Sequence, residues 1–129
     1  MDTVSTISFV HANLQHSIAV SRVISRTVCV KGIYVALIQE SWYREDCIKG
    51  LNVPGYTLFS ASGTDRPCAC ILMRNEMAWL LPGFSCRDLV AVLIQYNDEG
   101  AEQSLVVCSA YLPYDSEDPP LSKELEELM

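Results

Sequence analysis

The sequence predicts a single domain of mixed α/β class, in which a helix covers a β-sheet. The chain has 129 residues, the size of one domain, and half of them are apolar, enough for a sizeable core. Its first third reads as strand, helix, strand, a crossover unit that places two parallel strands in one sheet. The rest reads as short strands between turn signals, which favours a sandwich or mixed sheet over a doubly wound fold.

The crossover unit is defined by three segments. Residues 7–12 are rich in β-formers and predict the first strand. Ser17 is a candidate N-cap for a helix whose apolar residues recur three and four apart, ending at Lys31 and Gly32. Residues 33–38 are apolar and largely β-branched, and they predict a strand buried on both faces.

Turn residues divide the second part of the chain. Residues 41–55 form a loop long enough to be functional. A tight reversal at 74–76 would pair the strand that follows it with the strand before it, and residues 97–100 predict a hairpin whose glycine takes a positive φ. Ser122 is a candidate N-cap for a final helix. Strands are therefore expected at 56–60, 69–73, 77–81, 89–96 and 103–111.

The composition of the chain limits the cellular compartments and the binding partners that can be expected for it. Nine basic and sixteen acidic residues give a net charge of −7, which argues against binding nucleic acid through a broad basic field. It leaves open an enzyme that handles a phosphodiester through a metal ion. The absence of a secretory pattern and of any run as long as a membrane span predicts an intracellular protein, nuclear or cytoplasmic, with no membrane partner.

The six cysteines are expected to be buried free thiols, because most of them lie inside apolar runs of a chain without a secretory pattern. No disulfide is expected. Cys68 and Cys70 fall on one face of a strand and could form half of a zinc site. No second pair has ligand spacing, so a zinc site is disfavoured.

Three polar side chains stand at the ends of predicted strands: Asn13, Glu40 and Tyr111. Glu40 directly follows the buried strand. It either marks the point where that strand reaches solvent or serves as a metal ligand or general base, because ligands bind outside the carboxyl ends of strands in open α/β sheets. If the strands are neighbours in two packed sheets, the three side chains share one edge.

An amide, a carboxylate and a phenol suit chemistry on a phosphodiester. Glu40, with Asn13, would hold a divalent cation such as Mg²⁺. Asn13 and Tyr111 would donate hydrogen bonds to phosphate oxygens or orient an attacking water. Each signal alone is weak, because asparagine after a strand usually belongs to a turn and tyrosine in a strand usually packs.

For the other polar residues that could bind a ligand, a structural or solvent-exposed role is the simpler interpretation. His11 and His16 are candidate metal ligands, but a structural or solvent role is favoured for both. Arg22, Arg26 and Lys31 of the predicted helix could contact nucleic acid, but cations on a helix surface are usually just solvated. Asp88 is expected to begin a strand and pair locally, with a supporting role at the edge as the alternative.

Short motifs around these residues resemble a known family. The stretches FVHANLQ (9–15), IQESW (38–42) and SAYLP (109–113) resemble the first three motifs of the endonuclease/exonuclease/phosphatase superfamily. The family's asparagine, glutamine–glutamate pair and tyrosine fall on Asn13, Gln39 with Glu40, and Tyr111. RPCACIL (66–72) and CRDLVAV (86–92) are similar to the apurinic-type endonuclease domain at the start of non-LTR retrotransposon polyproteins.

The resemblance implies residues 1–129 as the amino-terminal part of such a domain, with a partial four-layer α/β sandwich. It implies a DNA endonuclease dependent on Mg²⁺, or on Mn²⁺ in its place. This enzyme would nick one strand to prime the reverse transcriptase region downstream in the polyprotein.

The departure from the family pattern is equally informative. Nothing in this sequence matches the family's Gly-Asp-x-Asn motif, its later aspartate or its terminal Asp-His pair. We therefore expect a chain truncated before those motifs and inactive alone. The alternatives are a non-catalytic remnant and a small interaction module whose sheet edge recruits another chain, so enzyme status stays open.

Overall fold

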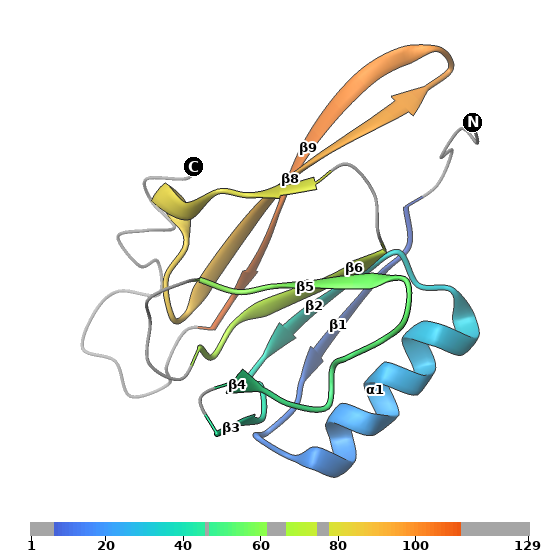
Figure 1. The fold of residues 1–129 in the computed structure, drawn as a ribbon. Helices are drawn as coiled ribbons and strands as arrows, with labels where there is room; N and C mark the ends of the chain where they lie inside the picture. The colour runs from blue at the N-terminus through green and yellow to red at the C-terminus, as the bar shows by residue number, and fades with distance from the viewer. Residues whose placement is uncertain (1–6, 46, 62–66, 75–77, 112–129) are drawn as a thin grey trace.

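A computed structural model describes residues 7–45, 47–61, 67–74 and 78–111. Within these ranges the chain folds into an α-helix, a four-stranded sheet, a three-stranded sheet and a two-stranded ribbon, and Figure 1 shows their arrangement. The elements in chain order are β1 (Phe9–Asn13), α1 (Ile18–Lys31), β2 (Val35–Gln39), β3 (Tyr43–Arg44), β4 (Cys47–Ile48), β5 (Tyr56–Phe59), β6 (Cys70–Arg74), β7 (Ala78–Leu80), the 3-10 turn η1 (Pro82–Phe84), β8 (Leu89–Asp98) and β9 (Ala101–Ala110).

The predicted crossover unit is confirmed. β1 and β2 pair in parallel, with Asn13 opposite Gln39 at their carboxyl ends. α1 begins after Ser17, whose side chain accepts a hydrogen bond from the Val20 amide. It ends at Gly32, which takes the left-handed conformation at φ 62° as a C-terminal glycine does.

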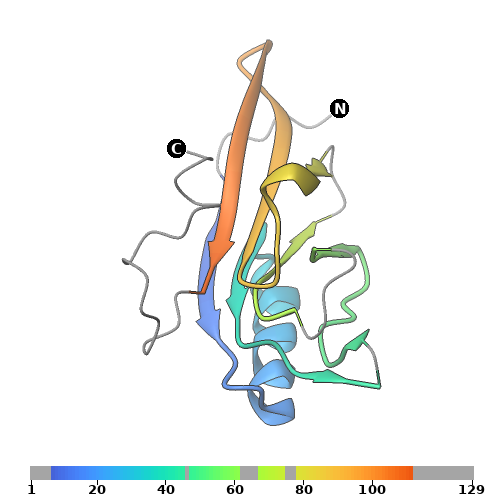
Figure 2. The ribbon, with the colours of Figure 1, turned by 90° about the vertical axis from the view of Figure 1, so that its left-hand side faces the viewer.

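The mixed α/β class is confirmed, and the described residues supply three layers. α1 covers one face of the sheet ordered β1-β2-β6-β5, and the sheet ordered β7-β8-β9 covers the other, as Figures 1 and 2 show. Alternate residues of the middle sheet serve the two cores, as strand geometry requires. Ile38 and Leu72 pack in the cluster that includes Val28 of α1, whereas Val35 and Ile71 pack in the cluster that includes β8.

β2 is the central strand of this architecture. Val35, Ala36 and Ile38 are fully buried, so the prediction of a strand covered on both faces is confirmed. Because packing fixes both of its faces, the carboxyl end of β2 is a rigid platform for the residues that follow it.

The hairpin predicted at residues 97–100 is also confirmed. Asp98 pairs with Ala101, and the two turn residues, Glu99 and Gly100, have φ values of 50° and 83°. Two successive positive φ values match the type I′ turn that best fits the twist of a hairpin. The far end of this hairpin extends beyond the rest of the described residues in Figure 1.

Two sequence predictions about the middle of the chain are wrong. The strand after the reversal does not pair with the strand before it, because β7 pairs with β8 in the other sheet while β6 lies between β2 and β5. The segment 41–55 is not a plain loop, because it contains the short antiparallel pair β3 and β4. The final helix predicted after Ser122 lies outside the described residues.

The burial expected for the cysteines is only partly correct. All six are free thiols, but Cys29 and Cys47 are exposed, while Cys68 and Cys70 are buried. Cys29 follows the buried Val28 by one helical position and so points away from the sheet. Burial raises the pKa of the Cys70 thiol to about 12.

Candidate functional site

The three strand ends selected from the sequence meet at one edge of the sandwich. Asn13 is the last residue of β1 and lies opposite Gln39, which directly precedes Glu40. The Gln39 side chain donates a hydrogen bond from Nε2 to Ser109 Oγ at 2.9 Å. Ser109 lies two residues before Tyr111, so this bond joins the carboxyl ends of β2 and β9 across the two sheets.

The Gln39–Ser109 bond is a site feature that the sequence analysis missed. Gln39 is 5% exposed and Ser109 is 1% exposed. Ser109 Oγ in turn donates a hydrogen bond to the Ile38 carbonyl oxygen at 2.7 Å, so the two side chains form a short buried hydrogen-bond chain. The glutamine beside Glu40 was the available signal, but nothing local indicates which residue it reaches.

Glu40 occupies an unusual backbone conformation. Its φ is 51°, in the left-handed region that non-glycine residues seldom adopt. The segment after β1 holds it on one side, since the Leu14 amide donates to the Gln39 carbonyl and the His16 amide donates to the Glu40 carbonyl, both at 2.9 Å. His16 Nδ1 also lies 3.0 Å from the Ser41 carbonyl oxygen, a hydrogen bond in the tautomer that carries the proton there.

The segment before β6 holds the other side of Glu40. The Ser41 amide donates to the Cys68 carbonyl at 3.3 Å. Ser41 Oγ donates to the Pro67 carbonyl at 2.7 Å. The peptide on each side of Glu40 is thus held by hydrogen bonds, while its side chain is half-buried and no described residue pairs with its carboxylate.

Asn13 is exposed and already takes part in a turn. Its Oδ1 accepts a hydrogen bond from the Gln15 amide at 2.8 Å, which is the ordinary role of asparagine after a strand. Strand alternation places Asn13 and Gln39 on the face turned toward the second sheet. Its Nδ2 donates to no described residue and is available to a ligand.

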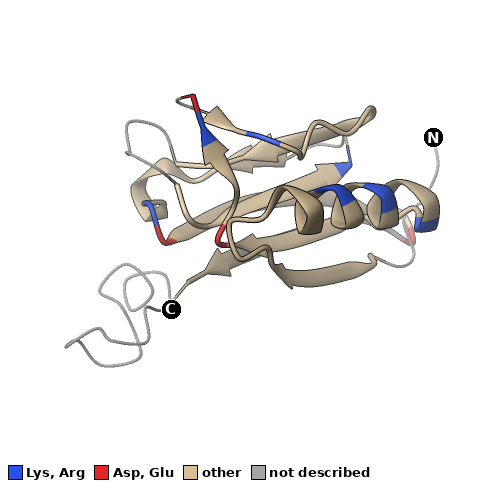
Figure 3. Ribbon diagram, turned by 90° about the horizontal axis from the view of Figure 1, so that it is seen from below, with Lys and Arg blue, Asp and Glu red and all other residues tan. Residues whose placement is uncertain are grey.

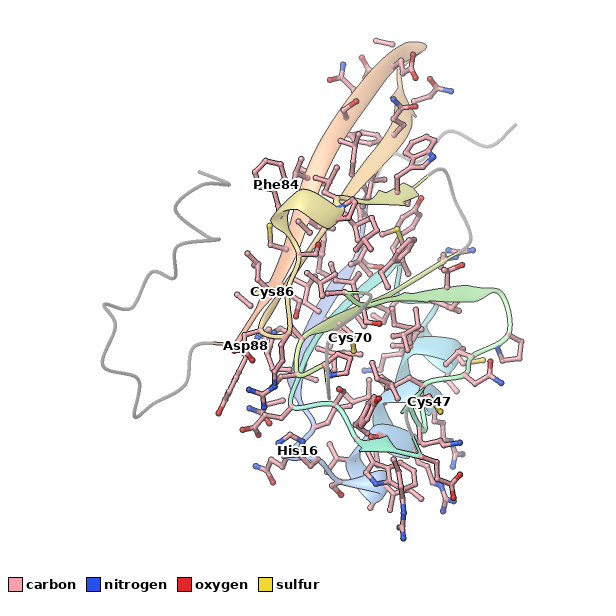
Figure 4. The ribbon with its side chains drawn as sticks, turned by 60° about the vertical axis from the view of Figure 1, so that its left-hand side comes forward. His16, Cys47, Cys70, Phe84, Cys86 and Asp88 are labelled. Carbon is pink, nitrogen blue, oxygen red and sulfur yellow. The ribbon has the colours of Figure 1, made fainter. Side chains whose placement is uncertain are left out.

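Tyr111 is tied to the start of β8. Its amide donates to the Asp88 carbonyl at 2.7 Å. Asp88 Oδ1 is buried without a hydrogen-bond partner among the described residues, and its nearest cation is Arg87, with Nη1 3.9 Å away. Figure 4 shows Asp88 and His16 on the same side of the molecule. The local pairing expected for Asp88 is therefore a long contact with its neighbour.

A surface pocket of about 300 Å³ lies next to Glu40. Its wall combines two aromatic rings, an imidazole and a guanidinium, which are groups that stack on bases and contact phosphates. The lining residues are His16, Ser41, Trp42, Tyr43, Pro67 and Arg87.

The described residues do not form a dedicated metal cage. No group of three His, Cys, Asp or Glu side chains among them could hold a metal ion. His11 is exposed on β1 and His16 contacts a backbone carbonyl, so neither joins such a group. A Mg²⁺ ion needs only one or two protein oxygens, because it keeps several waters and takes the rest from phosphate. Glu40 fits that lighter requirement.

Charge is unevenly distributed along the chain. The described residues hold seven Lys and Arg against six Asp and Glu, although the whole chain carries −7. α1 contributes Arg22, Arg26 and Lys31 and no acidic residue, and Figure 3 shows these cations repeating along the helix.

The fold is similar to a solved structure described as the endonuclease domain of TRAS1, a telomere-specific non-LTR retrotransposon. The two share 20% sequence identity with a TM-score of 0.63. The match covers 85% of this chain and 48% of that one, so this chain spans about half the length of that domain. No protein-family model matches the sequence, and no curated protein matches it either. Within the described ranges, the helix is too short to span a membrane.

Proposed function

We propose that this chain contributes the Glu40 side of a DNA endonuclease site of the non-LTR retrotransposon type. The observation that carries the proposal is Glu40 itself: a carboxylate without a described partner, on a fixed backbone, at the edge where the ends of β1, β2 and β9 meet. The fold similarity to the TRAS1 endonuclease domain supports the same reading.

Each residue has a defined task in this proposal. Glu40 would hold Mg²⁺, or Mn²⁺ in its place, which when bound stabilises charge on a phosphate and lowers the pKa of a coordinated water. Asn13 would donate from Nδ2 to a phosphate oxygen, since its Oδ1 is already engaged by the Gln15 amide. Tyr111 would hydrogen-bond a second phosphate oxygen from the end of β9.

The pocket beside Glu40 would accommodate a nucleotide flanking the phosphate. Stacking on aromatic rings such as Trp42 and Tyr43 tolerates any base, and Arg87 at the same wall supplies a positive charge. In this proposal a reverse transcriptase region of the same polyprotein would extend the nicked strand. An intracellular location, nuclear or cytoplasmic, is part of the same proposal.

The catalytic set within residues 1–129 is incomplete in this proposal, because a single carboxylate leaves most of the cation's charge uncompensated. Loss of single groups that stabilise a transition state costs on the order of 10²–10³ in rate. We therefore expect no nicking of supercoiled plasmid by residues 1–129 with Mg²⁺ or Mn²⁺. A longer protein that adds the family's later motifs should nick.

In that longer protein, Glu40→Ala should abolish nicking. Glu45→Ala is the matched control, because Glu45 is exposed in the turn between β3 and β4 and pairs with Lys49 at 3.6 Å. Nicking by the longer protein that survives Glu40→Ala would refute the role of Glu40. Nicking by residues 1–129 that depends on Glu40 would refute the prediction that their catalytic set is incomplete.

A further inference from the structure

An apolar row crosses the outer face of the second sheet. Trp79, Leu93 and Val106 lie directly opposite one another on β7, β8 and β9, and these three residues form the outer row. Val92 and Val107, their neighbours along β8 and β9, belong to the core between the two sheets. Because side chains alternate along a strand, the outer row points away from that core.

The outer row is exposed to solvent. Trp79 is 44% exposed and Val106 is 45% exposed. Single exposed apolar side chains are normal on a protein surface, but these three are cross-strand neighbours and so form one patch. The next pair on the same face toward the hairpin turn is Gln95 with Ser104, which gives the patch a polar border on that side. A contiguous apolar patch with a polar border is typical of a surface that another segment covers.

Residues 121–129, outside the described part of the chain, carry a matching apolar stripe in their sequence. Leu125, Leu128 and Met129 are spaced as i, i+3 and i+4, the pattern of one face of a helix. Lys123 and Glu127 fall on the opposite face, and Ser122 is the candidate N-cap. The sequence therefore predicts a short amphipathic helix whose apolar face needs a partner.

The connection to this segment is long enough to bring it onto the outer row. Nine residues, 112–120, separate it from Tyr111 at the end of β9. Nine extended residues span up to roughly 30 Å, whereas the way back along β9 from Tyr111 to Val106 is about 17 Å. A helix over 123–129 is about 10 Å long, which equals the width of three neighbouring strands.

We infer that residues 121–129 fold back as an amphipathic helix and dock on the outer row of the second sheet. An isolated helix this short is marginal in water, so its formation depends on that contact. The short tether gives the segment an effective concentration on the order of millimolar, while the net charge of −7 makes two copies of the chain repel each other. The chain's own segment is therefore favoured over a second copy. This inference goes beyond the proposed function and does not depend on it.

The test uses residues 1–129 with Trp42→Phe, which leaves Trp79 as the single tryptophan. Leu125→Ala/Leu128→Ala removes the apolar stripe and keeps helix propensity, because alanine is the best helix former. It should shift Trp79 emission to longer wavelength and raise the quenching of Trp79 by acrylamide. The matched control is Lys123→Ala/Glu127→Ala, which places two alanines on the opposite face at unchanged net charge and should leave both readouts as they are.

The sheet side of the contact has its own pair of variants. Val106→Asp puts a charge into the outer row, so the amides of residues 124–129 should lose protection from hydrogen exchange. Gln103→Asp is the control, because Gln103 is exposed on the other face of the same strand, and it should keep that protection. If Val106→Asp does not fold, the alanine variants of the segment still decide, because they leave the sheet unchanged.

Three results would overturn the inference. Equal Trp79 emission in Leu125→Ala/Leu128→Ala and its parent would show that the segment does not cover the row, which would leave the row to a different protein. Protection of residues 124–129 that persists in Val106→Asp would place their contact elsewhere. Trp79 quenching that rises when the parent is diluted would assign the row to a second copy of the chain.

Discussion

The left-handed backbone of Glu40 makes a prediction about stability that reverses the usual rule for glycine. In ordinary helices and strands, glycine is less stable than alanine by about 0.5–1 kcal/mol, because it gives up more chain entropy on folding. At φ 51° an alanine carries a Cβ that crowds the backbone, at a cost of about 1–2 kcal/mol, and glycine does not. The second term exceeds the first, so Glu40→Gly should be more stable than Glu40→Ala.

The expected gap is about 0.5–1 kcal/mol, the difference between those two effects. Urea unfolding can resolve it, because a slope of about 2 kcal/mol/M converts it into a midpoint shift of about 0.3–0.5 M. Both variants lack the carboxylate, so their comparison isolates the backbone from the loss of charge. Equal slopes for the two variants are needed for the midpoints to report stability alone.

Two other positions calibrate the measurement. Glu99 has φ 50° in the hairpin turn, so Glu99→Gly should also be more stable than Glu99→Ala. Arg22 is exposed on α1, where glycine should be less stable than alanine by about 1 kcal/mol. If Glu40 gives the order seen at Arg22, its backbone is not left-handed in solution, and the arrangement of the backbone hydrogen bonds around it is refuted.

Two further predictions concern buried polar groups. Gln39→Met and Ser109→Ala should each cost about 1–3 kcal/mol, because each breaks the buried Gln39–Ser109 hydrogen bond, and Ser109→Ala also removes the donor to the Ile38 carbonyl. The double variant should cost less than the sum of the two, and strict additivity in urea unfolding would contradict a direct bond. The Cys70 thiol has its pKa raised to about 12 from 9.0 by burial, so it favours the folded state in full below about pH 9 and loses that contribution as pH rises toward 12. Wild type should therefore lose more stability than Cys70→Ala between about pH 8 and 10.5, and parallel losses would refute the burial of this thiol.

The sequence was a reliable guide where structure is set by neighbours along the chain. Ser17 and Gly32 bound α1 because capping depends on local backbone geometry, and Gly100 closes the hairpin for the same reason. The crossover unit follows because a helix between two nearby strands leaves them few arrangements other than parallel pairing. These features need no knowledge of the rest of the fold.

The sequence failed where pairing partners are distant. β7 reads as a plausible partner for β6, but it pairs with β8, because burial of its apolar residues against the second core decides the outcome. Strand propensity reflects such contacts rather than a local preference. The Gln39–Ser109 bond spans 70 residues and belongs to the same class. The shared edge of Asn13, Glu40 and Tyr111 could be predicted from strand ends, but the chemical roles of these residues stay predictions.

Net charge is a weak guide to one site, because it is a sum over the whole chain and not the charge of one surface. Of the sixteen acidic residues, ten lie outside the described ranges. A phosphate backbone at the edge near Glu40 would interact mainly with charges close to that edge. Exposed charges farther away than about 10 Å are largely screened at ordinary salt. α1 begins five residues after Asn13 and carries three cations with no acid. The described residues, with seven Lys and Arg against six Asp and Glu, therefore do not share the acidic balance of the whole chain.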